Sequence, residues 1–384
     1  MDKILLTVTQ VVPDTEDAIL IYFEDSQIPR FLPGQFLTLL VPVEGITLRR
    51  SYSICTDPEQ WPRVGICVKR LPGGKVSNHL ADHLRAGQTL EVLPPYGSFR
   101  WDPQQEHPDS LVLIGAGSGI TPLMSVLQAA LHHPKQPSVT LIYGSKDPEH
   151  TLFRASLDAL VLTGQGRLKV VHCWSRTAPP MASDANQNAV PNNETPKATP
   201  TSSYFGRIDA EALRRFCCDS QGQADPNAQY YLCGPEGLVH DSQQWLLHQG
   251  IAGQRLHKEL FFQSPSTAPS GQETPASPPP APFDPVEEEQ ALPVVTLKVD
   301  GKVYEFAVEN GRFILETALE QGIDLPYACT MGVCGMCRAK KISGDMHLGD
   351  QEALSTSEIA SGACLTCVGK PLSKRLVIDY DVPN

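Results

Sequence analysis

Short apolar runs separated by proline- and glycine-rich turns fill the chain before about Trp101. The runs are Ile4–Val11, Ala18–Phe23, Phe36–Leu40, Ser51–Cys55, Val64–Val68 and Thr89–Val92. Strands this short and this regularly spaced are typical of an all-β sandwich or barrel. The pattern therefore predicts an antiparallel β-barrel as the first domain.

A different rhythm begins at Leu111, where short apolar runs alternate with segments of helical periodicity. Leu111–Ile114 precedes Pro122–His132, Val139–Tyr143 precedes Phe153–Leu162, Tyr230–Cys233 precedes Leu238–His248, and Leu168–Trp174 is a further apolar run. Strands that alternate with helices favour a parallel sheet with helices on both faces. The sequence thus predicts an α/β domain with a parallel sheet after the barrel.

Two polar stretches interrupt these patterns. Residues Gln263 to Leu292 are rich in Pro, Ser and Ala with almost no large apolar side chain, so they cannot bury enough surface to offset the entropy of folding, and we interpret them as a linker. Thr177 to Ser203 is similarly polar and predicts a surface loop inserted in the middle domain.

After the linker, Val294–Val299 and Val303–Val308 form two alternating runs around Asp300-Gly301, which predicts a β-hairpin. A helix from Phe313 to Gln321 and a cysteine-rich loop follow. The whole pattern divides the chain into residues 1–105 (barrel), 106–262 (α/β domain), 263–292 (linker) and 293–384 (cysteine-rich domain).

Composition narrows the function classes. The chain is 41% hydrophobic and 19% charged, as is ordinary for a globular protein, and its net charge of −12 makes nucleic acid an unsuitable partner. The amino terminus has no signal-peptide pattern and no apolar run is as long as a membrane span, so we expect a cytoplasmic protein that does not insert into membranes. In that compartment, the eleven cysteines favour metal or redox chemistry over disulfides.

The cysteine-rich loop carries the most specific motif. Cys329, Cys334 and Cys337 are spaced C-x4-C-x2-C, and Cys367 follows after residues 338–366. This is the ligand pattern of a plant-type [2Fe–2S] cluster, and Gly332 and Gly335 suit a loop whose amides approach sulfur closely.

A structural zinc site is the competing interpretation of these cysteines. Cys334, Cys337, Cys364 and Cys367 also form two CxxC pairs, but the gap between the pairs is longer than is usual in a zinc knuckle. Zinc leaves Cys329 unexplained, whereas the iron–sulfur interpretation leaves only Cys364, which a buried apolar position accommodates.

Two motifs in the barrel suit a flavin. Arg50-Ser51-Tyr52-Ser53 offers a cation for a pyrophosphate and an aromatic face for an isoalloxazine ring, although strand packing alone explains such a tetrapeptide. The segment 73–78, GGKVSN, opens a predicted helix whose free amides can receive phosphate oxygens, and an ordinary helix cap by Ser77 or a neighbour is the alternative.

Two further motifs fall in the α/β domain. The segment 115–122, GAGSGITP, follows a buried strand and starts a helix, which is the arrangement that holds a dinucleotide pyrophosphate, although its spacing is not GxGxxG. Cys233-Gly234-Pro235 places a thiol at the carboxyl edge of the sheet, where ligands of open α/β sheets bind; a core cysteine is the alternative.

In their order along residues 1 to 262, these motifs and Glu259-Leu260-Phe261 resemble the ferredoxin–NADP reductase superfamily. The tail resembles plant-type ferredoxin, which implies a β-grasp fold, and the whole chain resembles oxygenase reductases, the phenylacetyl-CoA epoxygenase reductase among them. The resemblance implies that Arg50, Tyr52 and Ser53 contact flavin and that Val76 and Ser77 bind its pyrophosphate. It places Gly117 and Thr121 at the nicotinamide nucleotide and Cys233 and Glu259 near hydride transfer, and adds Ser51, Val68, Lys69, Gly74, Lys75 and Phe261 to the cofactor contacts.

The resemblance also bears on the choice of cofactors. The family uses FAD or FMN, and the GGKVSN segment is similar to the FAD branch. Ser175-Arg176 ends the third strand where NADPH-using relatives bind the 2′-phosphate, and a bidentate Arg suits a phosphate. We therefore expect FAD, and NADPH ahead of NADH; a solvated surface arginine is the alternative.

These observations predict an NAD(P)H-dependent flavin and iron–sulfur reductase that passes electrons to a terminal oxygenase. A reductase of a hybrid-cluster or other iron–sulfur acceptor protein has the same domain order, and a zinc-binding interaction module on a flavoprotein scaffold is the alternative from another class. His79 and His83 have the spacing of zinc ligands but lack the glutamate of HExxH, so we expect surface or packing histidines.

Overall fold

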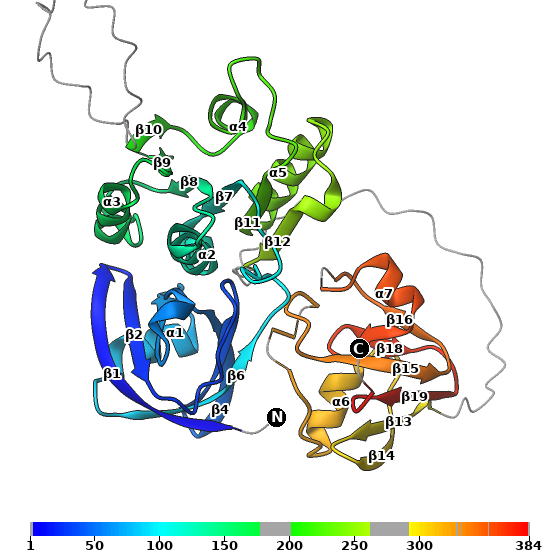
Figure 1. Cartoon of the computed structure of the whole chain (residues 1–384). Coiled ribbons are helices and arrows are strands. Elements are labelled where there is room, and N and C mark those ends of the chain that lie inside the picture. The colour runs from blue at the N-terminus through cyan, green and yellow to red at the C-terminus, as the bar shows by residue number, and fades with distance from the viewer. Residues whose placement is uncertain are drawn as a thin grey trace, which may run out of the picture. The chain divides into compact units, whose positions relative to one another are not determined.

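The structure is a computed structural model that describes residues 3–176, 201–261 and 292–382, apart from residues 328, 331 and 352. Two compact units form, Met1–Phe261 and Phe262–Asn384. The predicted linker lies outside the described residues, except for Leu292. Each unit is described by itself (Figure 1).

The amino-terminal barrel is a six-stranded antiparallel sheet in the order β4-β3-β6-β1-β2-β5. Its strands are β1 (Ile4–Thr15), β2 (Ala18–Glu24), β3 (Phe36–Val43), β4 (Ile46–Ser53), β5 (Arg63–Lys69) and β6 (Thr89–Tyr96). A bridge between Ile54 and Ile66 joins the two edges, and alternate side chains such as Leu6, Val8 and Phe23 fill the interior. The predicted barrel is confirmed.

One strand of the barrel was predicted in the wrong place. The expected strand Ser51–Cys55 is the end of β4, which begins at Ile46. Its first half, Ile46–Arg49, is exposed or only half-buried, so no alternation of buried residues marked it. Helix α1 (Lys75–His83) and the short 3-10 helix η1 (Pro58–Gln60) complete the barrel domain.

The second half of this unit is a six-stranded parallel sheet in the order β10-β9-β8-β7-β11-β12. Its elements are β7 (Ser110–Ala116), η2 (Gly117–Gly119), α2 (Ile120–His132), β8 (Ser138–Ser145), α3 (Arg154–Thr163), β9 (Leu168–Trp174), β10 (Thr201–Phe205), α4 (Ala210–Cys217), β11 (Gln229–Gly234), α5 (Glu236–His248), η3 (Gly253–Arg255) and β12 (Leu256–Leu260).

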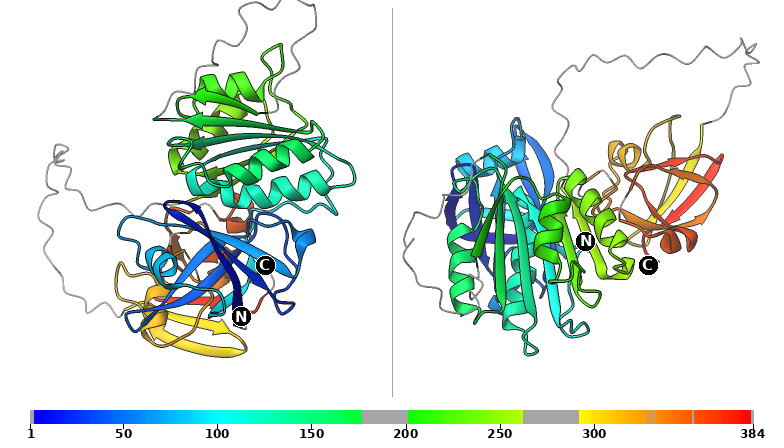
Figure 2. Two further views of the ribbon diagram at one scale, coloured as in Figure 1. Left: turned by 90° about the vertical axis from the view of Figure 1, so that its left-hand side faces the viewer. Right: turned by 90° about the horizontal axis from the view of Figure 1, so that it is seen from above.

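Helices cover both faces of this sheet, as predicted (Figure 2). One buried cluster packs α2 and α3 against Leu111, Leu113 and Leu141, and a second packs α4 and α5 against Val112 and Ile114. Alternate residues of β7 therefore serve opposite faces, so nearly every strand position is buried. The predicted loop Thr177 to Ser203 is corrected at its end, because Thr201–Ser203 belong to β10; residues 177–200 lie outside the described residues.

The carboxyl-terminal unit is a β-grasp domain, as the resemblance implied. Its main sheet has the order β14-β13-β19-β15-β17, and a two-stranded sheet pairs β16 with β18. The elements are β13 (Val294–Val299), β14 (Lys302–Ala307), α6 (Ile314–Glu320), β15 (Arg338–Ser343), β16 (Met346–Leu348), α7 (Thr356–Ala360), β17 (Ala363–Leu365), β18 (Gly369–Pro371) and β19 (Arg375–Asp379). Asp300 and Gly301 have φ values of 50° and 72°, the left-handed pair that a tight hairpin needs.

Candidate functional site

The Arg50-Ser51-Tyr52-Ser53 motif lies on the last half of β4. Arg50 is exposed, whereas the Tyr52 ring packs against the barrel core and Ser53 is buried. Ser51 shares a hydrogen bond of 3.0 Å with Thr38 on β3, which fixes the strand next to the motif. Burial raises the pKa of the Tyr52 hydroxyl, so it is a neutral hydrogen-bonding group near neutral pH.

The GGKVSN segment starts α1 with its first amides free of side-chain caps. Gly74 is the N-cap residue, without a side-chain cap, and no acidic residue lies in the first turn. Ser77 is therefore not the cap: its hydroxyl accepts a hydrogen bond from the Leu71 amide at 3.2 Å and holds the preceding loop. A helix start of this kind suits pyrophosphate oxygens.

Val68, Lys69, Lys75 and Val76 have partners within the barrel. Val68 and Val76 are buried in its core, so only their backbone is available to a cofactor. Lys69 donates to Asp17 at 2.9 Å, and Lys75 lies 3.5 Å from Glu44 with both side chains exposed.

The glycine loop joins β7 to α2 and is packed against β11. A Cβ atom on Gly119 would meet the Cys233 carbonyl oxygen at 2.2 Å, so only glycine fits. Gly117 has a φ of 56° with open space around it, and the Thr121 hydroxyl donates to the Ser118 carbonyl at 2.9 Å. The loop is thus packed against β11 at Gly119, while the space around Gly117 stays open.

Tyr143 supports this loop and was not predicted from the sequence. Its ring is fully buried at the end of β8, and its hydroxyl donates to the Gly117 carbonyl at 3.0 Å and accepts from the Leu152 amide at 3.3 Å. A tyrosine in an apolar strand resembles any core residue, so no local signal distinguished it.

Cys233 and Glu259 are brought together at the carboxyl edge of the sheet. They are register partners on β11 and β12, and the Cys233 sulfur lies 4.0 Å from a Glu259 carboxylate oxygen. Burial raises the pKa of Glu259 to about 8 and that of Cys233 well above its usual value. Phe261 follows, its amide donating to the Gly234 carbonyl at 3.0 Å. At neutral pH the site therefore holds a thiol and a mostly protonated carboxyl.

Ser175 and Arg176 lie just beyond β9 at the same carboxyl edge. The Ser175 amide donates to Ser145 at 3.1 Å and the Arg176 amide donates to Lys146 at 2.9 Å, which continues the parallel pairing past the strand end. The Arg176 side chain is exposed. The backbone of this pair is fixed, and the guanidinium faces solvent.

Two of the predicted cluster ligands, Cys334 and Cys367, share side-chain hydrogen bonds with a third, Cys329. The Cys337 and Cys367 sulfur atoms lie 3.1 Å apart, and the Met336 amide donates to the Cys334 sulfur at 3.4 Å. The Cys329 thiol, together with burial, raises the pKa of Cys334, and Cys329, Cys337 and burial raise that of Cys367. The hydrogen bond with Cys367 instead lowers the pKa of Cys337. Thiols whose ionisation is linked in this way suit a metal centre that binds them as thiolates.

Cys364 has a different environment. It is buried on β17 opposite Ala339, and its thiol donates to the Ala339 carbonyl at 3.4 Å. His79 and His83 stack on each other on α1 with ring centroids 4.8 Å apart, and His83 bonds the His79 carbonyl, an ordinary helical contact.

Three family models match successive parts of the chain. They describe an oxidoreductase FAD-binding domain over residues 4–101, an oxidoreductase NAD-binding domain over 113–244 and a 2Fe-2S iron-sulfur cluster binding domain over 297–372. One component of the 1,2-phenylacetyl-CoA epoxidase of Escherichia coli K12 is 32% identical, with 98% of this chain and 97% of that protein covered. The chain belongs to the family of oxygenase reductases with FAD-binding, NAD-binding and 2Fe–2S domains.

A second relative and a solved structure agree with this family assignment. The ferredoxin reductase component of 3-ketosteroid-9-alpha-monooxygenase from Rhodococcus rhodochrous is 31% identical, with 98% of this chain and 97% of that protein covered. The solved structure of phthalate dioxygenase reductase has the same fold, with a TM-score of 0.57, 23% identity and 98% of each chain covered. The predicted cofactors, FAD, a nicotinamide nucleotide and a [2Fe–2S] cluster, are confirmed at the level of the domains.

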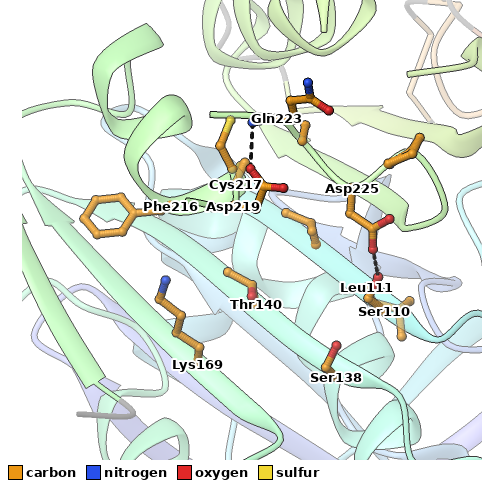
Figure 3. Close-up of a pocket in the computed structure, with 14 residues that line it drawn as sticks. Ser110, Leu111, Ser138, Thr140, Lys169, Phe216, Cys217, Asp219, Gln223 and Asp225 are labelled. Atoms are coloured by element: carbon orange, nitrogen blue, oxygen red, sulfur yellow. Dashed lines mark hydrogen bonds between the residues drawn. The ribbon is translucent and has the colours of Figure 1, made fainter. Parts of the chain in front are cut away.

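A cavity of about 490 Å³ in the reductase lies elsewhere (Figure 3). It opens at the amino-terminal ends of β7, β8 and β9, beside the end of α4, and none of the predicted site residues lines it. Within the part of the chain that the structure describes, no helix is long and apolar enough to cross a membrane.

Proposed function

We propose that this reductase takes a hydride from NADPH or NADH and delivers single electrons to a terminal oxygenase. The observation that carries the proposal is full-length similarity to components of oxygenase systems, including those named for phenylacetyl-CoA epoxidase and 3-ketosteroid-9-alpha-monooxygenase. FAD, when bound, would supply a group that accepts two electrons as hydride and releases them singly, and a bound [2Fe–2S] cluster would carry single electrons onward.

The residues of β4 and α1 have the chemistry to hold FAD. Tyr52 supplies an aromatic face beside the barrel core, Arg50 a cation, and the uncapped amides from Lys75 to Ser77 suit the pyrophosphate. Gly117 and Thr121 would contact the nicotinamide nucleotide, whose phosphates suit the open side of the glycine loop. Cys233 and Glu259 would then border the nicotinamide and limit access of water to the reacting atoms.

Cys329, Cys334, Cys337 and Cys367 would ligate the cluster. Their mutual contacts and the glycines at 332 and 335, with φ values of 75° and 71°, support this assignment.

Arg176 would favour NADPH by binding its 2′-phosphate. The sequence boundaries at 105, 262 and 292 would separate the barrel, nucleotide, linker and ferredoxin parts, and the free cysteines suit the reducing cytoplasm.

The test is anaerobic reduction of the purified protein by NADPH and by NADH. We expect bleaching of the flavin absorbance, the electron paramagnetic resonance signal of a reduced [2Fe–2S] cluster, and turnover of an oxygenase from the same cells when that oxygenase is added. Reduction of a hybrid-cluster protein but of no oxygenase would overturn the proposed partner. Stoichiometric zinc without iron would overturn the cluster.

A further inference from the structure

Three side chains on one face of α2 reach three consecutive residues of the flavin domain. The Ser125 hydroxyl donates to the Thr56 carbonyl at 2.7 Å, and the Gln128 amide donates to the Cys55 carbonyl at 2.8 Å. One turn later, His132 Nδ1 bonds the Asp57 carboxylate. The spacing of three and then four residues is that of a single helix face, so one rigid element makes all three contacts.

The segment that receives these contacts continues directly from the flavin motif on β4. Its own position is fixed from the other side: the Cys55 amide donates to the Gly65 carbonyl at 2.8 Å, and the Gly65 amide donates to the Thr56 hydroxyl at 3.1 Å. The Asp57 carboxylate also accepts from the Glu59 amide at 3.1 Å and caps η1. The segment is therefore an anchored extension of β4.

The contact between Asp57 and His132 differs from a surface ion pair because the Asp57 carboxylate is buried. The Asp57 side chain is only 1% exposed, whereas that of His132 is 59% exposed. A buried carboxylate needs hydrogen-bond partners, and beyond its own helix cap the imidazole supplies one from the other domain. The exposed histidine can be replaced with little loss of packing, so a substitution of His132 tests this contact without disturbing the core.

A second contact holds the same two domains at another point. The Phe153 amide, at the start of α3, donates to the Asp14 carboxylate of β1 at 2.9 Å. Leu20 and Cys67 of the barrel also share one buried cluster with Met124 and Leu127 of α2. Two separate polar contacts together with an apolar one restrict rotation of the two domains as well as their separation.

We propose that Ser125, Gln128 and His132 are positioning residues that set the distance between the nucleotide and flavin sites. Helix α2 begins at the glycine loop, which is packed on Cys233, and its other end holds the extension of the strand that bears Tyr52. A shift of this helix therefore moves one site relative to the other. This inference rests on the proposed hydride transfer between the two sites.

The expected effect is on rate and not on affinity. Hydride transfer requires reacting atoms about 3–3.5 Å apart, and a misplacement of about 1 Å costs roughly a hundredfold in rate. The α2 side chains do not form the nucleotide loop itself, so the affinity for the nucleotide should change less than about twofold while flavin reduction slows by about ten- to a hundredfold.

The experiment compares Ser125→Ala/Gln128→Met and His132→Phe with the parent protein in anaerobic stopped-flow reduction by NADPH and NADH. Equilibrium dialysis with the oxidised nucleotide measures affinity, and flavin content is measured on the same samples. Hydrogen–deuterium exchange of the 54–60 segment, with and without FAD, reports the contact independently of activity. His248→Asn is the matched control, because His248 also ends a helix but hydrogen-bonds the Gln244 carbonyl of its own helix.

Slower flavin reduction with kept affinity and faster exchange of the segment supports the proposal. Unchanged reduction rates, or a loss of affinity as large as the loss of rate, overturns it. If the double variant does not fold, His132→Phe combined with Asp57→Asn decides, since it removes the buried charge together with its partner. If neither nucleotide reduces the parent protein, the proposed function is wrong. The contact between α2 and the 54–60 segment is then still tested by the exchange measurement.

Discussion

Gly119 and Cys233 approach so closely that no side chain fits between the glycine loop and the neighbouring strand. A Cβ atom on Gly119 would lie 2.2 Å from the Cys233 carbonyl oxygen and 2.8 Å from the Gly234 Cα atom. Both obstacles are backbone atoms, which cannot rotate away. The loop and the proposed hydride-transfer residue are thus positioned by one contact.

Gly119→Ala should therefore push the glycine loop away from β11. We expect a loss of about 1–3 kcal/mol in the free energy of unfolding, together with weaker nucleotide binding. Chemical denaturation and nucleotide titration measure the two effects. Gly253→Ala is the control, because a Cβ atom there meets nothing within 4 Å; equal effects of both substitutions would contradict the packing argument.

Cys334→Ser or Cys337→Ser should remove the [2Fe–2S] cluster and abolish reduction of one-electron ferredoxin-dependent partners. Reduction of ferricyanide by NAD(P)H should remain, because the flavin and nucleotide sites belong to a different compact unit. Iron content and visible absorbance report the cluster. Simultaneous loss of both activities in a folded variant would show that the two units do not work separately.

Cys364→Ser should keep the cluster, because the Cys364 thiol donates to the Ala339 carbonyl and a serine hydroxyl can replace it there. Cys367→Ser is the matched comparison, three residues away, and should lose the cluster because its sulfur lies 3.1 Å from that of Cys337. The opposite result would exchange the roles of the two cysteines.

Local patterns predicted the buried elements of the fold well. The predicted run Leu168–Trp174 has the same bounds as β9, and nearly every position of it is buried because a central parallel strand is covered on both faces. The edge strands β10 and β12 were missed, since Thr201–Phe205 and Leu256–Leu260 are short and largely polar. Helix α4 was missed too, being only eight residues long.

The parts of the site that depend on contacts distant in sequence could not be predicted. His132 ends α2, and its partner Asp57 lies 75 positions earlier, in another domain. Tyr143 supports Gly117 from 26 positions away. Motifs identify the groups that would touch cofactors, whereas the side chains that orient those groups have no spacing of their own.

Arg176→Ala should raise the KM for NADPH and leave that for NADH nearly unchanged, because only NADPH carries a 2′-phosphate. A charge-assisted hydrogen bond is worth about 1.5–3 kcal/mol, so the preference should shift by roughly ten- to a hundredfold. Steady-state kinetics with both nucleotides measure it. Arg214→Ala, which removes an exposed arginine from α4, is the control. Equal changes for the two nucleotides, or none, would make Arg176 a surface residue and favour NADH.

Glu259→Gln should remove a pH-dependent step from both stability and flavin reduction. Burial raises the pKa of Glu259 from 4.5 to about 8, so the folded protein binds this proton more tightly than the unfolded chain. The resulting stability is fully present below about pH 4.5 and is lost as the pH rises to about 8, with a slope of at most about 1.4 kcal/mol per pH unit. The glutamine variant has no such proton. The difference in unfolding free energy between parent and variant should therefore fall across this range and level off above it, as urea denaturation at a series of pH values will measure. The rate of flavin reduction in the parent should change near pH 8 and stay flat in the variant. A constant difference from pH 5 to pH 8 would mean that Glu259 is already ionised in the folded protein.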